Sequence, residues 1–485
     1  MARVVVLGAG ISGHTAAMIL RRKLGRDHEV VVVTPNRQWN WIPSNIWVGV
    51  GRMTAAQVTF PLAPIYKRLG ITLHQARAVA LHPEGDAEEA NPYVAIESTA
   101  EGHVGEATKI TYDYLINATG PKLNFAATPG LGPDGNSLSV CTYSHAEHAA
   151  KALAASIALM KTGVKQTFVV GTGHGTCTCE GAAFEYIFNL EFEIRRAGVR
   201  DQARIIMLTN EAELGDFGVD GLQLKRGGYV ISGQTFAESL FVERGVEWVT
   251  GAHVQKVEPN LVSYETLDGE SHTLPFDFAM LLPPFTGVGL KAYNRAGDDI
   301  STTLFAPNQF MKVDADYTAK PYEQWRAEDW PSTYQSPSYS NVFAVGIAFA
   351  PPHQISRPRK TKNGTVIAPA PPRTGMPSGI MGRVVALSII DRIKKGADAP
   401  LHRASMAKMG AACVASAGAG VLRGSAASMT MFPVVPDYQK YPGVGRDLGL
   451  TFGEIGSAGH WVKRILHTMF IYKAKARLGW WMIPE

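Results

Sequence analysis

The four cysteines of the chain are the residues best suited to redox chemistry: Cys141, Cys177, Cys179 and Cys413. A thiolate attacks sulfur or a flavin ring, and the positive end of a helix lowers the pKa of a thiol. Cys177 and Cys179 stand just before a helical stretch, so the sequence predicts a lowered thiol pKa for both. The alternative interpretation is a pair of small buried hydrophobic residues. Paired C-x-x-C spacings are missing, so we expect no metal site.

The elements that would position these thiols begin with a dinucleotide-binding pattern. Residues 3–7 and 30–33 are β-branched and apolar and predict two buried parallel strands. Between them stand a glycine-rich turn at 8–13 and a helical stretch at 14–24, whose first N–H groups would bind phosphates. The glycines of the turn allow, in order, a tight bend, close approach of a pyrophosphate and close helix–strand packing: Gly8, Gly10 and Gly13.

Three further segments are expected at the ribose and flavin ends of this site. The second strand ends in Thr34, where an acidic residue usually holds the ribose, so we expect this contact from Thr34, Asn36 or the backbone. Apolar strands at 114–117 and 341–345 stand where flavoproteins with two dinucleotide units bring backbone to FAD. They favour FAD over a free nicotinamide cofactor, the alternative being unrelated strands of an α/β sheet. The residues that end these strands are Ala118, Thr119, Gly120 and Gly346.

A second strand–turn–helix unit opens at residues 166–170, where a pyridine-nucleotide reductase would bind NAD(P)H. Thr176 occupies its third glycine position, and the turn runs directly into Cys177 and Cys179. The next strand, 204–209, ends without a strong ribose-binding carboxylate. The sequence therefore predicts a nucleotide-like unit whose turn carries thiols.

Length and composition set the frame for these motifs. The 485 residues are too many for one core and predict several domains, and a net charge of +5 is too small to indicate nucleic-acid binding. We expect no cleaved signal peptide and no membrane-spanning helix. The predicted fold class is α/β, with two tandem Rossmann-like domains and a C-terminal amphipathic helical region for membrane interaction. The expected parts are an FAD domain at 1–160 and 301–390, a second Rossmann-like domain at 161–300 that carries the redox cysteines, and a C-terminal quinone and membrane region at 391–485.

The segment 460–485 has the pattern of an amphipathic helix at a membrane surface. At about 100° per residue, one face collects apolar and aromatic side chains: Trp461, Ile465, Met469, Tyr472 and Ala476. The opposite face is basic: Lys463, Arg464, His467 and Lys475. Trp480 and Trp481 suit the headgroup region. A helix that covers the core, or a contact between copies in a homo-oligomer, is the alternative.

Together these segments resemble the sulfide:quinone oxidoreductases, flavoproteins related to flavocytochrome c sulfide dehydrogenase and type II NADH dehydrogenases, over nearly the whole chain. Residues 41–51 are similar to the segment of that family that meets the flavin. The resemblance implies catalytic roles for Cys141, His145, Cys179, Glu185 and Cys413. It implies FAD contacts at Pro43, Ser44, Arg373, Thr374 and Gly375, and quinone contacts at Phe470 and Val414.

The chain departs from the pattern of that family at several places. Cys177 is an additional thiol, and Arg373 replaces a lysine that approaches the flavin, keeping the charge but unable to lose its proton. Val414 stands where an aromatic residue often stacks on quinone, and Asp216 replaces a histidine. The proline-rich segment 351–372 is longer than expected. These changes indicate a divergent subtype.

The resemblance implies a mechanism in which hydrosulfide attacks a disulfide or sulfur-bridged pair of Cys179 and Cys413. FAD accepts two electrons and passes them to ubiquinone or menaquinone, while Cys141 assists release of polysulfide. His145 or Glu185 would move protons, the alternative for His145 being a surface helix residue. We expect a peripheral protein of a prokaryotic cell membrane whose partners are sulfide, quinone and the membrane surface.

The sequence leaves three other functions open. The first is the flavin subunit of a sulfide dehydrogenase that passes electrons to a cytochrome. The second is an NADH:quinone reductase, which the cysteine-bearing second turn disfavours. The third is a non-catalytic flavoprotein that senses sulfur.

Overall fold

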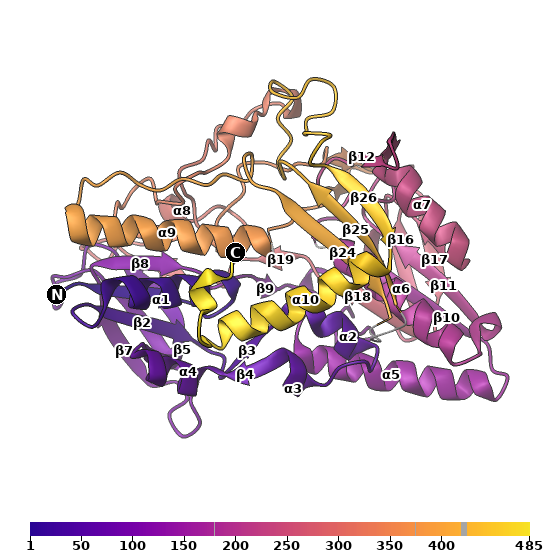
Figure 1. The fold of residues 1–485 in the computed structure, drawn as a ribbon, viewed down its shortest axis with the longest axis horizontal. Coiled ribbons are helices and arrows are strands. Elements are labelled where there is room, and N and C mark those ends of the chain that lie inside the picture. The colour runs from indigo at the N-terminus through magenta and orange to yellow at the C-terminus, as the bar shows by residue number, and fades with distance from the viewer. Residues whose placement is uncertain (179, 374, 419–423) are drawn as a thin grey trace.

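The computed structural model describes residues 1–178, 180–373, 375–418 and 424–485 (Figure 1). The N-terminal glycine turn follows a strand of an eight-stranded sheet. The strand order is β21-β8-β1-β2-β5-β6-β7, with β20 paired to β5. Pairing is parallel from β21 to β5 and antiparallel from β5 to β7. The strands are β1 (Arg3–Leu7), β2 (Glu29–Thr34), β5 (Thr72–His82), β6 (Tyr93–Ser98), β7 (Ala107–Thr111), β8 (Tyr114–Asn117), β20 (Lys291–Ala292) and β21 (Val342–Ala344).

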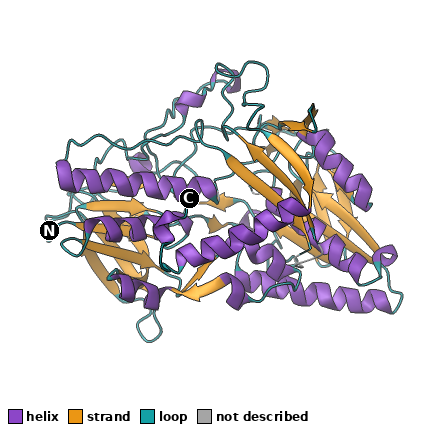
Figure 2. Ribbon diagram, in the orientation of Figure 1, coloured by secondary structure: helices purple, strands orange, loops and turns teal. Residues whose placement is uncertain are grey.

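Helix α1 (Ile11–Leu24) joins β1 to β2 and packs against α9 (Met376–Lys395) (Figure 2). It begins at the residue after Gly10, and Gly25 with φ +67° ends it. Basic residues fill its last turn, where they offset the negative end of the helix dipole. Shorter helices of this part are α2 (Asn45–Gly49), α3 (Ala55–Val58), α4 (Leu62–Leu69) and α8 (Ser301–Leu304).

A second, four-stranded sheet carries the cysteine-bearing turn. Its order is β14-β11-β10-β18, and every pair is parallel. The strands are β10 (Gln166–Thr172), β11 (Ala203–Leu208), β14 (Glu247–Val249) and β18 (Phe278–Leu282). The helices of this part are α5 (Tyr143–Lys161), α6 (Glu180–Arg196) and α7 (Gly233–Arg244).

A third sheet unites the second part of the chain with the C-terminal part, in the order β13-β12-β26-β25-β24. Its strands are β12 (Gln223–Arg226), β13 (Tyr229–Ser232), β24 (Ala411–Ala417), β25 (Ser425–Met431) and β26 (Phe452–Gly456). Helix α10 (Ser457–Ala474) follows β26 and lies against β24 and β25 (Figure 1). The small pairs and triplets are β3 (Gln38–Asn40) with β4 (Thr59–Pro61), β9 (Lys122–Leu123) with β19 (Phe285–Thr286), β15 (His253–Glu258) with β16 (Leu261–Glu265) and β17 (Ser271–Pro275), and β22 (Arg359–Lys360) with β23 (Val366–Ile367).

The mixed α/β fold expected from the sequence is confirmed. In the described part of the chain, no helix combines the length and apolar composition that crossing a bilayer requires. The C-terminal helix is shorter than its sequence pattern: it ends at Ala474, and Ala476 adopts a left-handed φ of +46°. Lys475 and Ala476 therefore do not belong to its faces, which is a correction to the predicted pattern.

Candidate active site

The first glycine turn has the shape of a nucleotide cradle. Gly8 has φ +97°, and a Cβ on it would lie 2.2 Å from Ala118 O. A Cβ on Gly13 would lie 2.0 Å from Gly8 O, so only glycine fits at either position. At Gly10, by contrast, no atom lies within 4 Å of that point. The fold closes two positions and leaves the third open beside the start of α1, which fits a pyrophosphate.

The strands that would meet the rest of FAD end at the same edge of the sheet. Gly346, which follows β21, has φ +67° and lies so close to Ser12 that a Cβ would be 2.3 Å from its Oγ. Thr119 donates its hydroxyl to Asn117 Oδ1 over 2.8 Å, which fixes the turn after β8. Gly120 has φ +70° with open space beside it. These residues fit a long ligand laid across the ends of β1, β8 and β21.

Thr34 ends β2 as a buried residue, and its Oγ1 accepts a hydrogen bond from Asn36 N over 3.4 Å. Both residues therefore stand at the end of β2, where the sequence predicts the ribose contact.

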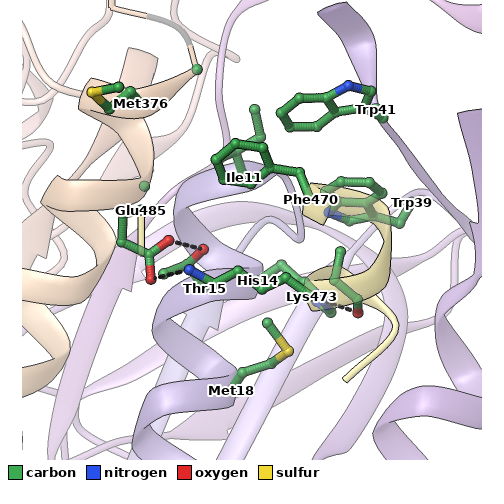
Figure 3. A pocket seen from close by; sticks show the side chains of 13 residues that line it. Ile11, His14, Thr15, Met18, Trp39, Trp41, Met376, Phe470, Lys473 and Glu485 are labelled. Carbon is green, nitrogen blue, oxygen red and sulfur yellow. Dashed lines mark hydrogen bonds and ion pairs between the residues drawn. The ribbon is translucent and has the colours of Figure 1, made fainter. Parts of the chain in front are cut away.

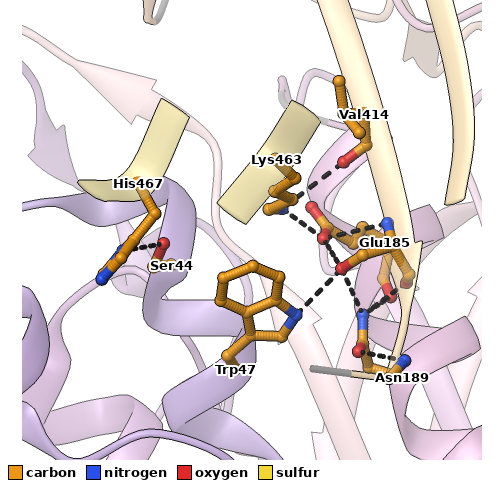
Figure 4. Close-up of polar contacts among 9 residues, drawn as sticks. Ser44, Trp47, Glu185, Asn189, Val414, Lys463 and His467 are labelled. Carbon is orange, nitrogen blue, oxygen red and sulfur yellow. Dashed lines mark hydrogen bonds and ion pairs between the residues drawn. The ribbon is translucent and has the colours of Figure 1, made fainter. Parts of the chain in front are cut away.

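The segment after β3 links the glycine turn to α10. Pro43 lies in a single 3₁₀ turn, Ile42–Ser44. The buried Ser44 Oγ forms a hydrogen bond of 2.9 Å with His467 Nδ1 on α10 (Figure 4). Burial, with a smaller effect from neighbouring cations, lowers the pKa of His467 to about 4, so this imidazole is neutral at pH 7.

A pocket connects the glycine turn with the aromatic residue predicted to meet quinone (Figure 3). Phe470 stacks on Trp41, with ring centroids 5.0 Å apart and planes 16° apart. Ile11 of the turn and Met376 of α9 line the same space. Val414 is not among the described residues that line it. The full lining is Ile11, His14, Thr15, Met18, Trp39, Trp41, Gly375, Met376, Gly379, Phe470, Lys473, Ala474 and Glu485.

Arg373 is held by the protein itself. Its guanidinium lies over the rings of Phe310 and Phe349, at 4.8 and 5.0 Å from their centroids, and donates to Phe349 O. Thr374 lies outside the described residues, and Gly375, with φ +66°, precedes α9. The arginine places a buried positive charge against the chain that follows β21.

Cys413 lies on β24 and faces the first turn of α6. Its Sγ is 3.4 Å from the position of a Cβ on Gly181. Cys179 lies outside the described residues, so its predicted pairing with Cys413 stays a prediction. Burial, together with the Glu185 carboxylate, raises the pKa of Cys413 to about 11, and the Lys463 ammonium opposes this.

Glu185 is the centre of a buried polar network between α6, β24 and α10 (Figure 4). It forms a buried ion pair with Lys463 of α10. Ser416 donates to the same carboxylate from its N–H, over 3.1 Å, and from its hydroxyl, over 2.5 Å. Trp47 Nε1 donates to Ser416 Oγ over 2.9 Å, and Asn189 Nδ2 donates to Ser416 O over 2.6 Å. The network fixes the strand that carries Cys413.

The predicted lowering of the Cys177 pKa is wrong. This thiol stands before α6 but is fully buried, and it donates to Leu282 O over 3.0 Å. Burial and the nearby Glu180 carboxyl raise its pKa well above the ordinary value. Desolvation of the thiolate therefore outweighs the helix dipole. Burial also raises the pKa of Cys141, to about 11.

His145 lies in the first turn of α5, and Thr142 Oγ1 accepts a hydrogen bond from its backbone N–H. The ring packs edge-on against Phe125, and Nδ1 is buried without a partner among the described residues. Burial lowers its pKa. The surface-helix interpretation is therefore incomplete, because the imidazole is half-buried.

The second glycine turn is covered by the chain itself, a feature that the sequence does not predict. Ala368 N donates to Gly175 O and Ala370 N donates to Cys177 O, each over 2.8 Å. A Cβ on Gly175 would lie 2.9 Å from both His253 Nδ1 and Val366 O. The long proline-rich segment thus forms a hairpin, β22–β23, and packs against the second glycine turn.

Helix α10 turns its basic residues inward and its apolar residues outward. Lys463 and Lys473 are buried and paired with Glu185 and Glu485. The exposed fractions of Trp461, Val462 and Ile465 are 42, 47 and 57%. Of the predicted apolar face, Trp461 and Ile465 are exposed, whereas Met469 and Tyr472 are partly buried. The predicted basic residue Lys463 contacts protein instead of solvent.

Comparisons with known proteins agree with this architecture. Residues 2–199 match the model of the pyridine nucleotide-disulphide oxidoreductase family. The chain is 28% identical to the sulfide-quinone reductase of Aquifex aeolicus, over 97% of this chain and 91% of that protein. It is 26% identical to the mitochondrial sulfide:quinone oxidoreductase of Mus musculus, over 71% of this chain and 64% of that protein.

Among solved structures, the X-ray structure of the Aquifex aeolicus sulfide:quinone oxidoreductase superposes with a TM-score of 0.74 at 26% identity, covering 98% of this chain and 92% of that one. An NAD-dependent persulfide reductase from A. fulgidus shares the fold, with a TM-score of 0.54 at 14% identity over 94% of this chain and 73% of that one. The resemblance predicted from the sequence is confirmed.

Proposed function

We propose that this chain is a sulfide:quinone oxidoreductase, a peripheral membrane enzyme that oxidises hydrosulfide to sulfane sulfur or polysulfide and reduces quinone. The observation that carries the proposal is the placement of the Cys413 thiol against the first turn of α6, beside a second glycine turn that the β22–β23 hairpin covers. The covered turn disfavours a nicotinamide dinucleotide as the electron donor, and the adjacent thiol favours sulfide.

FAD is the cofactor, held by the first glycine turn, the end of β2 and the turns after β8 and β21. Gly10 and Gly120 leave room for it, and Gly375 lines the pocket that reaches the first glycine turn. Pro43 and Ser44 follow Trp41, another residue of that lining. Bound FAD supplies a two-electron acceptor between sulfide and quinone. We assign the eight-stranded sheet and the four-stranded parallel sheet to the two tandem Rossmann-like domains. The third sheet takes β12 and β13 from the second of these domains, and β24 to β26 from the C-terminal region that α10 completes.

The thiols receive the sulfur of the substrate. Hydrosulfide attacks the bridged pair of Cys179 and Cys413, which leaves one cysteine as a persulfide and the other as a thiolate. The Lys463 ammonium favours the thiolate form of Cys413, and the Glu185 carboxylate, which it neutralises, disfavours it. Cys141 and His145, close to the start of α5, assist the release of sulfur and of protons.

Quinone enters through the membrane-facing side of α10. The exposed Trp461, Val462 and Ile465 provide an apolar surface on that helix, and Phe470 lies on the same helix in the pocket that reaches the glycine turn. An apolar surface of this kind inserts into the interfacial region of a bilayer. Phe470 with Trp41 forms the aromatic wall for the quinone ring, whereas Val414 contributes its carbonyl to Lys463.

Sulfide-dependent reduction of decylubiquinone tests the enzymatic proposal. We expect turnover in the wild type, its loss in Cys179→Ser and Cys413→Ser, and its retention in Cys177→Ser, whose hydroxyl can still donate to Leu282 O. Full turnover in both of the first two variants would contradict the proposed pair.

Co-sedimentation with liposomes tests the membrane contact. The double change Trp461→Gln with Ile465→Gln should release the protein, while Leu450→Gln, which alters an exposed apolar residue outside α10, should not. Equal sedimentation of both variants would argue against α10 as the membrane surface.

A further inference from the structure

A group of buried carboxyl groups at the start of α6 takes no part in the mechanism above. Glu180 is fully buried, and neither oxygen of its carboxyl has a hydrogen-bond partner among the described residues. Asn210 Oδ1, beside it, is likewise buried and without a partner there. A carboxyl group without solvent or donors is stable only with its proton attached.

Two further carboxyl groups meet Glu180 around a single turn. Glu211, 1% exposed, accepts from Phe217 N over 2.7 Å, and Asp216 accepts from Gly218 N over 2.9 Å. Oε2 of Glu180 lies 3.5 Å from the position of a Cβ on Gly218. The turn at residues 216–218 therefore brings all three carboxyl groups into one neighbourhood.

This neighbourhood opens to the surface in one direction. A pocket lined by Asn210, Asp216, Asp220, Arg357 and Arg359 leads outward from it. Asp216 is partly buried, and Asp220 and both arginines are exposed. In the other direction, Glu180 lies close enough to Cys177 to raise the pKa of that thiol. The carboxyl groups thus extend from the cysteine-bearing turn to solvent with increasing exposure.

The arrangement does not suit a metal ion. The carboxylate oxygens of Glu180, Glu211 and Asp216 do not all lie within 4.8 Å of one another, so they cannot share one ion. Among the described residues, only the surface side chains Asp268, Glu270 and His272 bring three ligand atoms that close together. A series of carboxyl groups with raised pKa values and no common centre is suited to passing protons from one to the next.

The charged and titratable groups that face this series are few. Besides Cys177, they are the buried Arg446, whose charge is felt by Asp216 and Asp220, and the phenols of Tyr322 and Tyr438 near Asp220. Arg446 is occupied by backbone carbonyls such as Val219 O, at 2.6 Å. Burial raises the pKa of Glu211 to about 7 and that of Glu180 well above the ordinary range. Glu211 can therefore exchange protons near neutral pH, whereas the protonated form of Glu180 is favoured.

We propose that Glu180, Glu211 and Asp216 form the path by which protons leave the sulfide-oxidising site for the surface pocket at Asp220, Arg357 and Arg359. The inference rests on the proposed function. Oxidation of one hydrogen sulfide to sulfane sulfur releases two electrons and two protons. The electrons leave to quinone, which takes up two protons at its own site. Glu180, which holds a proton at rest, passes it toward Glu211, Asp216 and finally water, and takes up a proton from sulfur in its place. The three carboxyl groups are regenerated in each cycle.

Infrared spectroscopy of the FAD-loaded protein tests whether Glu180 holds a proton. We expect a carboxylic-acid C=O band at pH 7 that disappears in Glu180→Gln and persists in Glu213→Gln, a change of an exposed carboxylate in the same loop. An unchanged band in Glu180→Gln would overturn the assignment.

Stopped-flow bleaching of the flavin by sulfide, without oxygen, tests the transfer. Glu180→Gln should slow bleaching about a hundredfold, the size of effect typical of general acid–base groups, and Asp216→Asn about tenfold. Glu213→Gln should match the wild type, and reoxidation by decylubiquinone should be unchanged in every variant. The flavin absorbance of each variant reports that it has folded.

Wild-type bleaching rates in both Glu180→Gln and Asp216→Asn would overturn the path. A wild-type protein that sulfide does not bleach would instead contradict the proposed function, and the infrared band would still decide whether Glu180 is protonated. The two failures are thereby distinguishable.

Discussion

The two glycine turns of this protein belong to two strand–turn–helix units of the same kind, but one turn faces open space and the other faces protein. In the first turn, the glycine at the centre, Gly10, faces open space. In the second turn, every glycine faces protein: a Cβ would lie 1.8 Å from Leu208 O at Gly171, 2.4 Å from Leu131 at Gly173, and 2.9 Å from Val366 O at Gly175. One turn is a ligand cradle and the other is a packed core.

The difference teaches that the unit is a scaffold whose loops decide its use. The first turn keeps its phosphate-facing side free, and the carboxyl ends of three strands surround it. In the second turn, the β22–β23 hairpin takes that side, and the helix that follows turns its first residues toward Cys413. In the proposed enzyme, this second turn therefore serves the thiols instead of a nucleotide.

The largest effect should come from filling the first turn. Gly13→Val places a side chain 2.0 Å from Gly8 O, which backbone cannot relieve, so we expect a loss of more than about 3 kcal/mol and no yellow soluble protein. Yield, flavin absorbance and thermal unfolding measure it. As a control, Gly10→Ala meets no atom within 4 Å and should fold but bind FAD more weakly. A Gly13→Val protein with normal flavin content would remove the first half of the comparison.

The helix after the second turn should depend on its buried ion pair. Lys463→Met leaves the Glu185 carboxylate buried without its partner, which should cost about 3 kcal/mol. Loss of the ammonium should also raise the pKa of the Cys413 thiol further and slow its alkylation at pH 8 about tenfold. Peptide mass spectrometry follows that single cysteine. Lys473 lies on the same helix as Lys463 and forms an ion pair with Glu485. The control variant Lys473→Met breaks that ion pair and should leave the alkylation rate of Cys413 unchanged. Equal slowing in both variants would contradict the electrostatic account.

The acidic residues behind the second turn should make stability fall with pH. Burial raises the pKa of Glu211 from 4.5 to about 7, so the folded protein keeps a proton that the unfolded chain loses. The folded state is therefore favoured most at low pH, and its advantage is lost as the pH rises from about 4.5 through about 7. Glu211→Gln should raise the free energy of unfolding at pH 8 by about 1–3 kcal/mol and change it little at pH 4. Denaturant unfolding at the two pH values measures it, and a larger gain at pH 4 would contradict the raised pKa.

The smallest expected effect is that of NADH on the melting temperature of the FAD-loaded protein. A ligand that binds only the folded state stabilises it, by about 2.7 kcal/mol at a hundred times its Kd. We expect FAD to raise the melting temperature of the apoprotein and NADH to leave that of the FAD-loaded protein unchanged. A clear shift with NADH would mean that the hairpin yields and that the second turn still binds a nucleotide.

The first turn could be predicted from the sequence because its signals are local. A buried strand, three spaced glycines and a helix follow one another within 24 residues, and each glycine position has a separate steric or binding reason. The environment of Cys177 could not be predicted in this way. The start of the helix is visible in the sequence, but burial of the thiol depends on distant strands such as β18.

Other features of the site also depend on long-range packing. The periodicity of α10 shows that it has two different faces but not which one meets the protein, so the inward Lys463 was not foreseen. The closing hairpin was signalled only by the unexpected length of the segment 351–372. Glu180 stands directly after the second turn, and Glu211 stands shortly after β11, so the sequence places both near this turn. Nothing nearby in the sequence shows that they are buried together.

An anaerobic titration of one FAD-loaded sample tests the central claim most directly. Hydrosulfide should bleach the visible flavin band, decylubiquinone should restore it, and NADH at the same concentration should leave it unaltered. Bleaching by NADH together with indifference to hydrosulfide would reverse the roles assigned to the two turns.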